Sequence, residues 1–178
     1  MPGLRDSNTL FGNSRVMTLT AHSIVGGAIV SLMPAYPVLG LCLAFASHFI
    51  LDAIPHWDYP VRSASLKPDI ATRMRYDRAL LKDLITIGTD ATLGVALASL
   101  LFAPQGHLLL VASGACAALL PDALQFAYMR YPRGPLLLLQ RFHWWIHTPV
   151  QIERPILGIG LQVAFIAAVV ITVRSGAP

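Results

Sequence analysis

Charged side chains are scarce in this sequence: they make up 12% of its 178 residues, whereas soluble domains carry about 25%. Hydrophobic residues make up 55%, and the mean hydropathy is +0.61. This composition excludes an ordinary soluble domain and is typical of a polytopic membrane protein. The net charge of +4 is modest and is not gathered into one basic stripe, so no nucleic-acid partner is expected.

Cysteine and the usual targeting signals are also scarce. The only two cysteines, Cys42 and Cys116, stand inside apolar runs without CxxC spacing, so we expect two buried free thiols. Residues 1–17 lack the apolar core and cleavage site of a signal peptide. No repeat, low-complexity tract or long linker divides the chain, so we expect an N-terminal arm at 1–17 and a single helical membrane domain at 18–174.

Long apolar segments separated by short polar connections define the fold class. They lie at about 20–33, 38–54, 79–102, 107–129 and 155–173. The sequence therefore predicts an all-α, polytopic integral membrane bundle with about four to five transmembrane helices. The first two segments are short for a crossing, which takes roughly 20 residues. A hairpin that enters the membrane only partway is the alternative for them.

The connections between these segments differ in charge. The connection 55–78 carries Arg62, Lys67, Arg73, Arg75 and Arg78, and the connection 130–154 carries Arg130, Arg133, Arg141 and Arg154. The turns 34–37 and 103–106 carry no Lys or Arg, and only Arg174 breaks the pattern. By the positive-inside rule both basic connections and the N-terminal arm are cytoplasmic. We expect a multi-pass protein of the cell inner membrane.

The stretch 47–59 is the most informative part of the chain because it places His48, Asp52 and His56 at the end of an apolar segment. Such a segment normally excludes polar groups, because burying a polar group without a hydrogen-bond partner costs roughly several kcal/mol. His48 and Asp52 are four residues apart and would share one helical face. Imidazole and carboxylate suit zinc or a similar divalent ion. Alternatively, these residues end a helix and face lipid headgroups.

Five further polar residues fall in the half of the bundle that we assign to the cytoplasmic side. They are His22, Asp90, Asp122, His143 and His147. A carboxylate at the depth of Asp90 or Asp122 needs a partner, and a shared cation provides one. We predict that His22, His48, Asp52 and Asp122 converge on one or more zinc ions, with His56, Asp90, His143 and His147 as additional ligands.

Each of these residues has a simpler alternative role. Asp122 follows Pro121 and could cap the helix that restarts after the proline. Asp90 has threonines nearby that could satisfy it by hydrogen bonding, and His22 could lie at the membrane interface. His143 and His147 flank two tryptophans, which are typical of an aromatic belt, and a helix at 135–148 would lie along the interface. Asp58 is expected to be solvated or to contact His56.

Three motifs carry a resemblance to a known family. Thr20-Ala21-His22, Ser47-His48-Phe49-Ile50-Leu51-Asp52 and Leu120-Pro121-Asp122 resemble motifs of the bacterial inner-membrane-associated, metal-dependent hydrolases of the YdjM-like group. The His-x-x-x-Asp spacing is also similar to that of zinc-dependent phospholipase C and single-strand nuclease. The resemblance implies that His48 and Asp52 bind zinc, with Asp52 bridging two ions. The chain departs from the family's His-Arg-Gly-x-Thr-His stretch, because it has Phe142-His143-Trp144-Trp145-Ile146-His147-Thr148 instead.

Two functions remain open from the sequence. The first is a metal-dependent hydrolase at the cytoplasmic membrane face that acts on a phosphodiester or phospholipid, with Asp52 or Asp90 as the catalytic base. In that case membrane lipids are its partners and the nearby arginines bind an anionic substrate. The second is a non-catalytic subunit or scaffold, in which the polar residues hold helices together or bind a cofactor such as haem within an oligomer or a larger complex.

Overall fold

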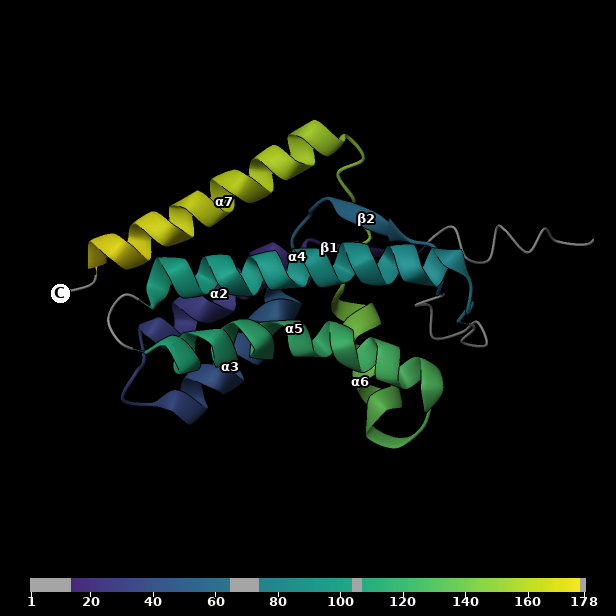
Figure 1. Cartoon of the computed structure of the whole chain (residues 1–178), viewed down its shortest axis with the longest axis horizontal. Coiled ribbons are helices and arrows are strands. Elements are labelled where there is room, and N and C mark those ends of the chain that lie inside the picture. The colour runs from purple at the N-terminus through teal and green to yellow at the C-terminus, as the bar shows by residue number, and fades with distance from the viewer. Residues whose placement is uncertain (1–13, 65–73, 104–106, 177–178) are drawn as a thin grey trace, which may run out of the picture.

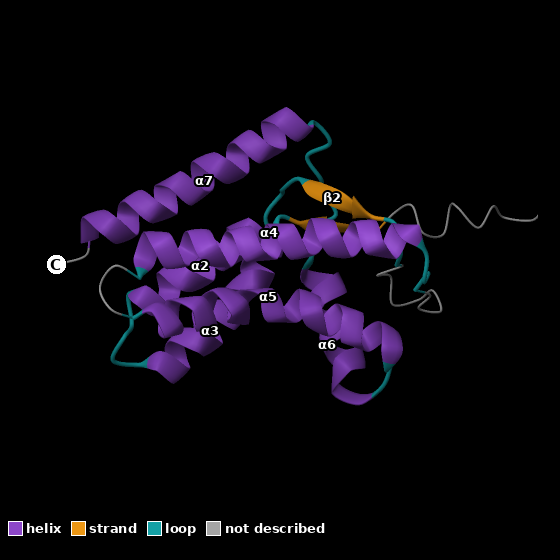
Figure 2. Ribbon diagram, viewed as in Figure 1, coloured by secondary structure: helices purple, strands orange, loops and turns teal. Residues whose placement is uncertain are grey.

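The structure is a computed structural model that describes residues 14–64, 74–103 and 107–176. Within these ranges the chain forms six helices and a ribbon of two short strands (Figures 1 and 2). The elements are β1 (Ser14–Met17), α2 (Leu19–Ser31), α3 (Pro37–Asp52), β2 (Asp58–Val61), α4 (Arg78–Phe102), α5 (Leu108–Arg130), α6 (Gly134–Ile146) and α7 (Pro155–Gly176). The predicted all-helical fold is thus confirmed, with the ribbon as an addition.

Helix length separates five of the six helices into two groups. Among the described residues, α4, α5 and α7 have 25, 23 and 22 residues and are long and apolar enough to cross a membrane. At 1.5 Å per residue they span about 33–38 Å, compared with a hydrocarbon thickness of about 30 Å. The 13 residues of α2 and 16 residues of α3 are too few by the same measure. Among the described residues, helix length supports three spans and not four to five, and a hairpin that enters the membrane partway stays a prediction for the short pair.

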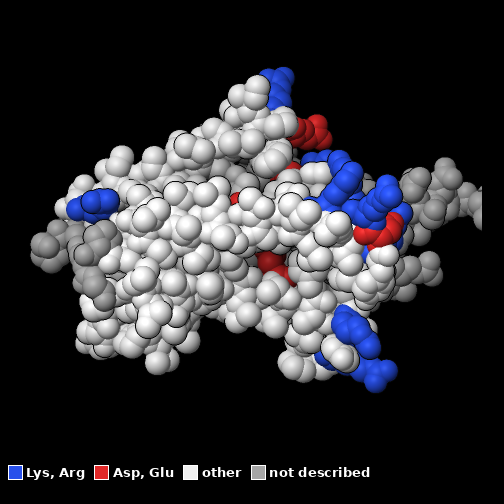
Figure 3. All heavy atoms as spheres, viewed as in Figure 1, with Lys and Arg blue, Asp and Glu red and all other residues white. Residues whose placement is uncertain are grey.

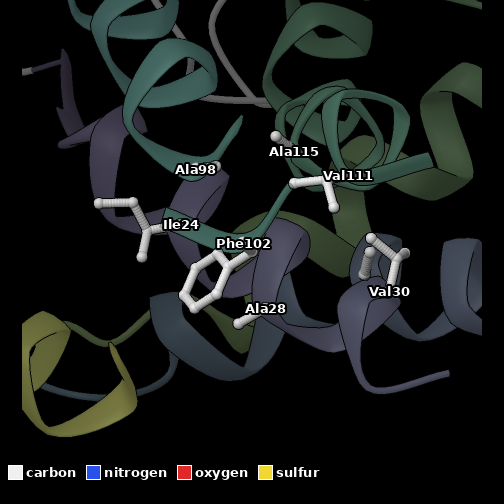
Figure 4. Close-up of a cluster of buried hydrophobic side chains, with 8 residues drawn as sticks. Ile24, Ala28, Val30, Ala98, Phe102, Val111 and Ala115 are labelled. Carbon is white, nitrogen blue, oxygen red and sulfur yellow. The ribbon is translucent and has the colours of Figure 1, made fainter. Parts of the chain in front are cut away.

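The short helix α2 lies at the centre of the bundle, where it packs against α3, α4, α5 and α7. Close approach to α5 depends on glycine, because a Cβ on Gly26 would collide with the backbone carbonyl of Gly114. Buried apolar side chains from α2, α3, α4 and α5 fill the end of the bundle where α4 ends and α5 begins. These are Ile24, Ala28, Val30, Ala44, Ala98, Phe102, Val111 and Ala115, most of them labelled in Figure 4.

The two strands form a small antiparallel ribbon that the sequence analysis did not predict. Ser14 pairs with Val61, and Met17 pairs with Asp58. Each strand has only four residues, which is too short for a clear alternation of polar and apolar positions, and the partners are far apart in sequence. With Leu19 and Ala64, the ribbon residues Val16, Tyr59 and Val61 form a second buried cluster. The ribbon thereby fixes the start of α2 and the segment that follows α3.

Basic side chains gather at the end of the molecule opposite the C-terminus, over the start of α4, the end of α5 and α6 (Figure 3). Arg174 lies in the last turn of α7, at the other end. Cys42 and Cys116 are both exposed on helix surfaces, so the prediction of buried thiols was wrong. An apolar run in a membrane helix does not reveal which face meets lipid and which meets the bundle, because both are apolar.

Candidate metal centre

Five polar side chains from four helices meet inside the bundle. His22 lies near the start of α2, His48 and Asp52 in the last turns of α3, Asp122 in α5, and His143 in α6. We call these residues the His/Asp cluster. All five are buried, and His22 and His48 have no exposed surface at all. Groups of this kind, whose ligand atoms lie within 4.8 Å of one another, can hold a metal ion.

The shortest contacts in the His/Asp cluster centre on Asp52. Its Oδ2 lies 2.7 Å from Nε2 of His143 and 3.1 Å from Nε2 of His48, and its Oδ1 lies 3.3 Å from Nε2 of His22. The two nitrogens of His48 and His143 are 3.4 Å apart, and Nε2 of His48 is 3.6 Å from Oδ1 of Asp122. Ligand atoms held tetrahedrally about 2.0–2.2 Å from one zinc are separated by about 3.3–3.6 Å. Most of the observed spacings have this size.

The hydrogen bonds of the histidines show which nitrogens are available. Nδ1 of His48 lies 2.8 Å from the carbonyl oxygen of Ala118. A carbonyl only accepts, so Nδ1 donates, and Nε2 is the nitrogen that faces the carboxylates. This arrangement fixes the ring orientation in the way that metal-binding histidines are usually held. The ring of His22 stacks on that of His48, with the ring centroids 4.1 Å apart.

His22 is the least satisfied member of the His/Asp cluster. Both of its ring nitrogens are buried and make no hydrogen bond within the described part of the chain, although Nε2 lies 3.3 Å from Oδ1 of Asp52 as an ion-pair contact. Nδ1 of His143 is in the same condition. Roughly nine tenths or more of the buried polar atoms in proteins have a hydrogen-bond partner. Leaving such an atom without one costs about 1–3 kcal/mol of stability. A cation bound between the imidazoles and carboxylates would remove that cost for His22.

A second group contains Asp52, His56 and His147, whose ligand atoms also lie within 4.8 Å of one another. In this structure His56 is already engaged on both sides. Its Nδ1 lies 2.6 Å from the carbonyl oxygen of Ile54, and its Nε2 lies 2.7 Å from Oδ1 of Asp58. Burial disfavours the charged imidazole, but the contact with Asp58 outweighs burial and raises the pKa of His56. His56 thus serves first as a partner of Asp58.

The structure gives Asp90 a different place. Its carboxylate oxygens lie 2.6 Å from the backbone nitrogen of Leu19 and 3.2 Å from that of Thr20, and both nitrogens donate to it. The hydroxyl of Thr20 adds a third hydrogen bond, of 2.6 Å. Asp90 therefore caps the N-terminus of α2 and satisfies free N–H groups in the interior of the bundle. It is in none of the groups able to hold a metal among the described residues.

Two glutamines support the cluster and were missed by the sequence analysis. Nε2 of Gln125 donates to Oδ1 of Asp122 at 2.9 Å, and Nε2 of Gln140 donates to Oε1 of Gln125 at 3.1 Å. This chain of amides links α6 to α5 and orients Asp122. A signal was present in the sequence, because Gln125 follows Asp122 by three residues and Gln140 precedes His143 by three, one helical turn in each case.

The His/Asp cluster opens into a cavity of about 730 Å³. We call it the polar cavity. Its walls include Asp52, Asp122, His143, His147 and Arg15. Trp144 and Trp145 stand at its edge, and both are exposed. The site can therefore be reached from outside the bundle, and it presents imidazoles and carboxylates to whatever enters.

Comparison with known proteins does not extend these observations. No family model, curated protein or solved structure matches the chain. The resemblance to the YdjM-like hydrolases therefore rests on the three motifs alone and stays a prediction.

Proposed function

We propose that this chain is a membrane-embedded, metal-dependent hydrolase with zinc as its metal. One observation carries the proposal: buried imidazoles and carboxylates from four helices lie in groups whose ligand atoms are within 4.8 Å of one another, and Nδ1 of His22 among them has no hydrogen-bond partner within the described part of the chain. Histidine and carboxylate are a zinc ligand set, and catalytic zinc sites keep a position open to water. The opening of the His/Asp cluster into the polar cavity provides access for water and substrate.

The contacts of each residue indicate its role, as a metal ligand or as a general base. Asp52 touches His22, His48 and His143 with its two oxygens, so it is best placed as a metal ligand. Asp122 lines the polar cavity, and its carboxylate accepts a hydrogen bond from Gln125, so it is the better candidate for a general base. Asp90 is occupied by the start of α2 and does not line the cavity. Zinc, when bound, lowers the pKa of its water to about 7 and polarises a substrate oxygen.

The substrate class follows from the surroundings of the site. Arg15 lines the polar cavity and favours an anionic group such as a phosphodiester. Three helices among the described residues are long and apolar enough to cross a membrane, and the exposed tryptophans of α6 suit a membrane interface. We propose a phospholipid or another membrane phosphodiester as substrate. By the positive-inside rule we place the basic end of the molecule on the cytoplasmic side of the inner membrane. Residues 1–13 of the predicted N-terminal arm lie outside the described residues.

Metal analysis of the purified protein tests the proposal directly. Zinc in stoichiometric amount, together with hydrolysis of a lipid phosphodiester that a chelator abolishes and zinc restores, supports it. A Soret band would instead indicate haem. Absence of both metal and cofactor would favour the non-catalytic scaffold, in which the His/Asp cluster only ties α2, α3, α5 and α6 together.

A further inference from the structure

A second cavity lies next to the polar cavity and has a different character. It has a volume of about 250 Å³ and lies between the end of α3 and the first half of α7. Its walls are mostly hydrocarbon and include Met17, Leu51, Ile54, Leu161 and Phe165. We call it the apolar groove. Met17 also lines the polar cavity, so the two cavities are neighbours that share a wall.

The polar atoms at the edge of the apolar groove are already paired. Gln162 is buried in α7, accepts a hydrogen bond from the hydroxyl of Thr18 at 2.8 Å, and donates one to the carbonyl of Trp57 at 2.8 Å. The side chain of His56 is held between Ile54 and Asp58. The groove therefore offers no free hydrogen-bonding group among these residues. It suits a hydrocarbon occupant and would hold water poorly.

The rim of the apolar groove faces outward. Ile54, Leu161 and Phe165 are 50%, 51% and 40% exposed, whereas Met17 and Leu51 at its inner wall are 5% and 6% exposed. In a membrane, the exposed faces of α7 meet lipid chains, since α7 is apolar and long enough to span. A lipid chain can thus enter from the side without leaving an apolar environment.

We propose that the apolar groove binds one acyl chain of an anionic membrane lipid whose headgroup occupies the polar cavity. The proposal rests on the proposed function and narrows its substrate to an amphiphile with chain and headgroup in the two adjoining cavities. Arg15 is the one basic side chain among the described residues that line the polar cavity, so it would contact the negative headgroup. The hydrolysed bond would then lie near Met17, on the side of the His/Asp cluster.

Photo-crosslinking tests this arrangement without relying on turnover. The full chain is placed in nanodiscs of phosphatidylcholine that contain phosphatidylglycerol with a diazirine in its acyl chain, and labelled residues are identified by mass spectrometry. We expect label on Leu51, which lines the apolar groove and not the polar cavity, and on Met17, which lies between the two cavities. Leu161→Trp fills the groove and should abolish that label. Val163→Trp, on an exposed part of α7 outside the groove, is the matched control and should preserve it.

Several outcomes separate this proposal from others. Label on Met17 and Leu51 no higher than on Leu81, an exposed residue of α4, would overturn it, as would label that Leu161→Trp leaves unchanged. Should Leu161→Trp not fold, Ile54→Trp at the opposite rim gives the same test. A dimer that Leu161→Trp dissociates, with no lipid label, would assign the groove to a second copy of the chain.

Two further controls test the anionic headgroup and separate lipid binding from zinc binding. A phosphatidylcholine probe should label Met17 less than the phosphatidylglycerol probe, and Arg15→Gln should remove that difference. Equal labelling by both probes of the unchanged protein would overturn the anionic headgroup. Asp52→Asn should keep the label although it loses zinc, so failure of the metal proposal and failure of the groove proposal give different results.

Discussion

Oδ2 of Asp52 lies 2.7 Å from Nε2 of His143, although the two residues are 91 positions apart in the chain. Both side chains are buried, although both also line the polar cavity. The backbone makes the same connection, because the amide of Thr148 donates to the carbonyl oxygen of Asp52 at 2.8 Å. The segment that follows α6 is thereby attached to the end of α3, and it forms one wall of the polar cavity.

The first prediction concerns Asp52, on which the cluster contacts converge. Asp52→Asn keeps the size of the side chain but removes the charge that a divalent ion needs, so we expect zinc content and phosphodiester hydrolysis to be lost together. The measurement is elemental analysis with an activity assay on the same preparation. Glu153→Gln removes an exposed carboxylate and serves as the control. Retained zinc in Asp52→Asn would remove Asp52 from the ligand set.

The second prediction uses the unpaired nitrogens of His22. His22→Leu should lower the stability of the zinc-loaded protein, because it removes a ligand. If zinc is present at 100 times its Kd and the variant no longer binds it, the loss is about 2.7 kcal/mol. Without zinc the same variant should be as stable as the unchanged protein or more so, since it removes a buried imidazole whose nitrogens make no hydrogen bond in the described structure. Thermal unfolding with zinc and with chelator measures both effects.

The opposite pattern would support the scaffold. If His22→Leu destabilises the protein equally with zinc and with chelator, the imidazole acts through packing or through its contact with Asp52. The stacked ring of His48 makes this a real alternative, because it loses a neighbour in the variant.

Local spacing predicted part of this site well. His48 and Asp52 are four residues apart in an apolar helix, and the structure places Nε2 of the one 3.1 Å from Oδ2 of the other. The scarcity of polar groups in a membrane segment singled out His22 and Asp122 for the same reason. His143 was identified as one of a pair with His147, and it is the member that contacts Asp52. Residues whose partners are distant in sequence were found because they are costly to bury alone.

The sequence could not assign partners to those residues. Asp90 is as unusual in an apolar helix as Asp122, yet it caps α2, because α2 begins beside the middle of α4. The spacing of residues in the sequence does not predict that the start of α2 packs beside the middle of α4. The pairing of β1 with β2 was missed for a related reason, since register over four residues depends on contacts with the rest of the fold.

The third prediction follows from the place of Asp90. Asp90→Ala leaves the first N–H groups of α2 without an acceptor, and loss of such a cap costs about 0.5–2 kcal/mol. The zinc content should be unchanged, because Asp90 contacts Leu19 and Thr20 and not the His/Asp cluster. Denaturant unfolding and elemental analysis provide the two measurements. A fall in zinc content of Asp90→Ala, in protein shown to be folded, would return Asp90 to the ligands.

The fourth prediction concerns membrane orientation. In a cysteine-free background, Arg133→Cys and His107→Cys place single thiols at exposed positions on opposite ends of α5. We expect an impermeant maleimide added outside sealed cells to label His107→Cys and to spare Arg133→Cys until the membrane is opened, as the positive-inside rule requires. Labelling in the reverse order would place the basic end and the polar cavity outside the cytoplasm.

The fifth prediction tests the amide chain behind Asp122. Gln125→Leu removes the hydrogen bond of 2.9 Å to Oδ1 of Asp122 and the acceptor of Gln140. Residues that hold a ligand or base in position typically contribute about 10–100-fold to metal affinity or activity. We expect a loss of that size in kcat, with KM for the lipid little changed, because Gln125 orients a group and is not needed to bind an acyl chain.

The conservative change Gln125→Glu separates orientation from packing. Glutamate fills the same space but places a second negative charge beside Asp122, where the amide had donated a hydrogen bond. If Gln125 acts through Asp122, Gln125→Glu should lose at least as much kcat as Gln125→Leu, because the new carboxylate repels Asp122 where the amide had donated to it. If Gln125→Glu instead keeps full activity, Gln125 does not act through Asp122, and the assignment of Asp122 as the base loses its support.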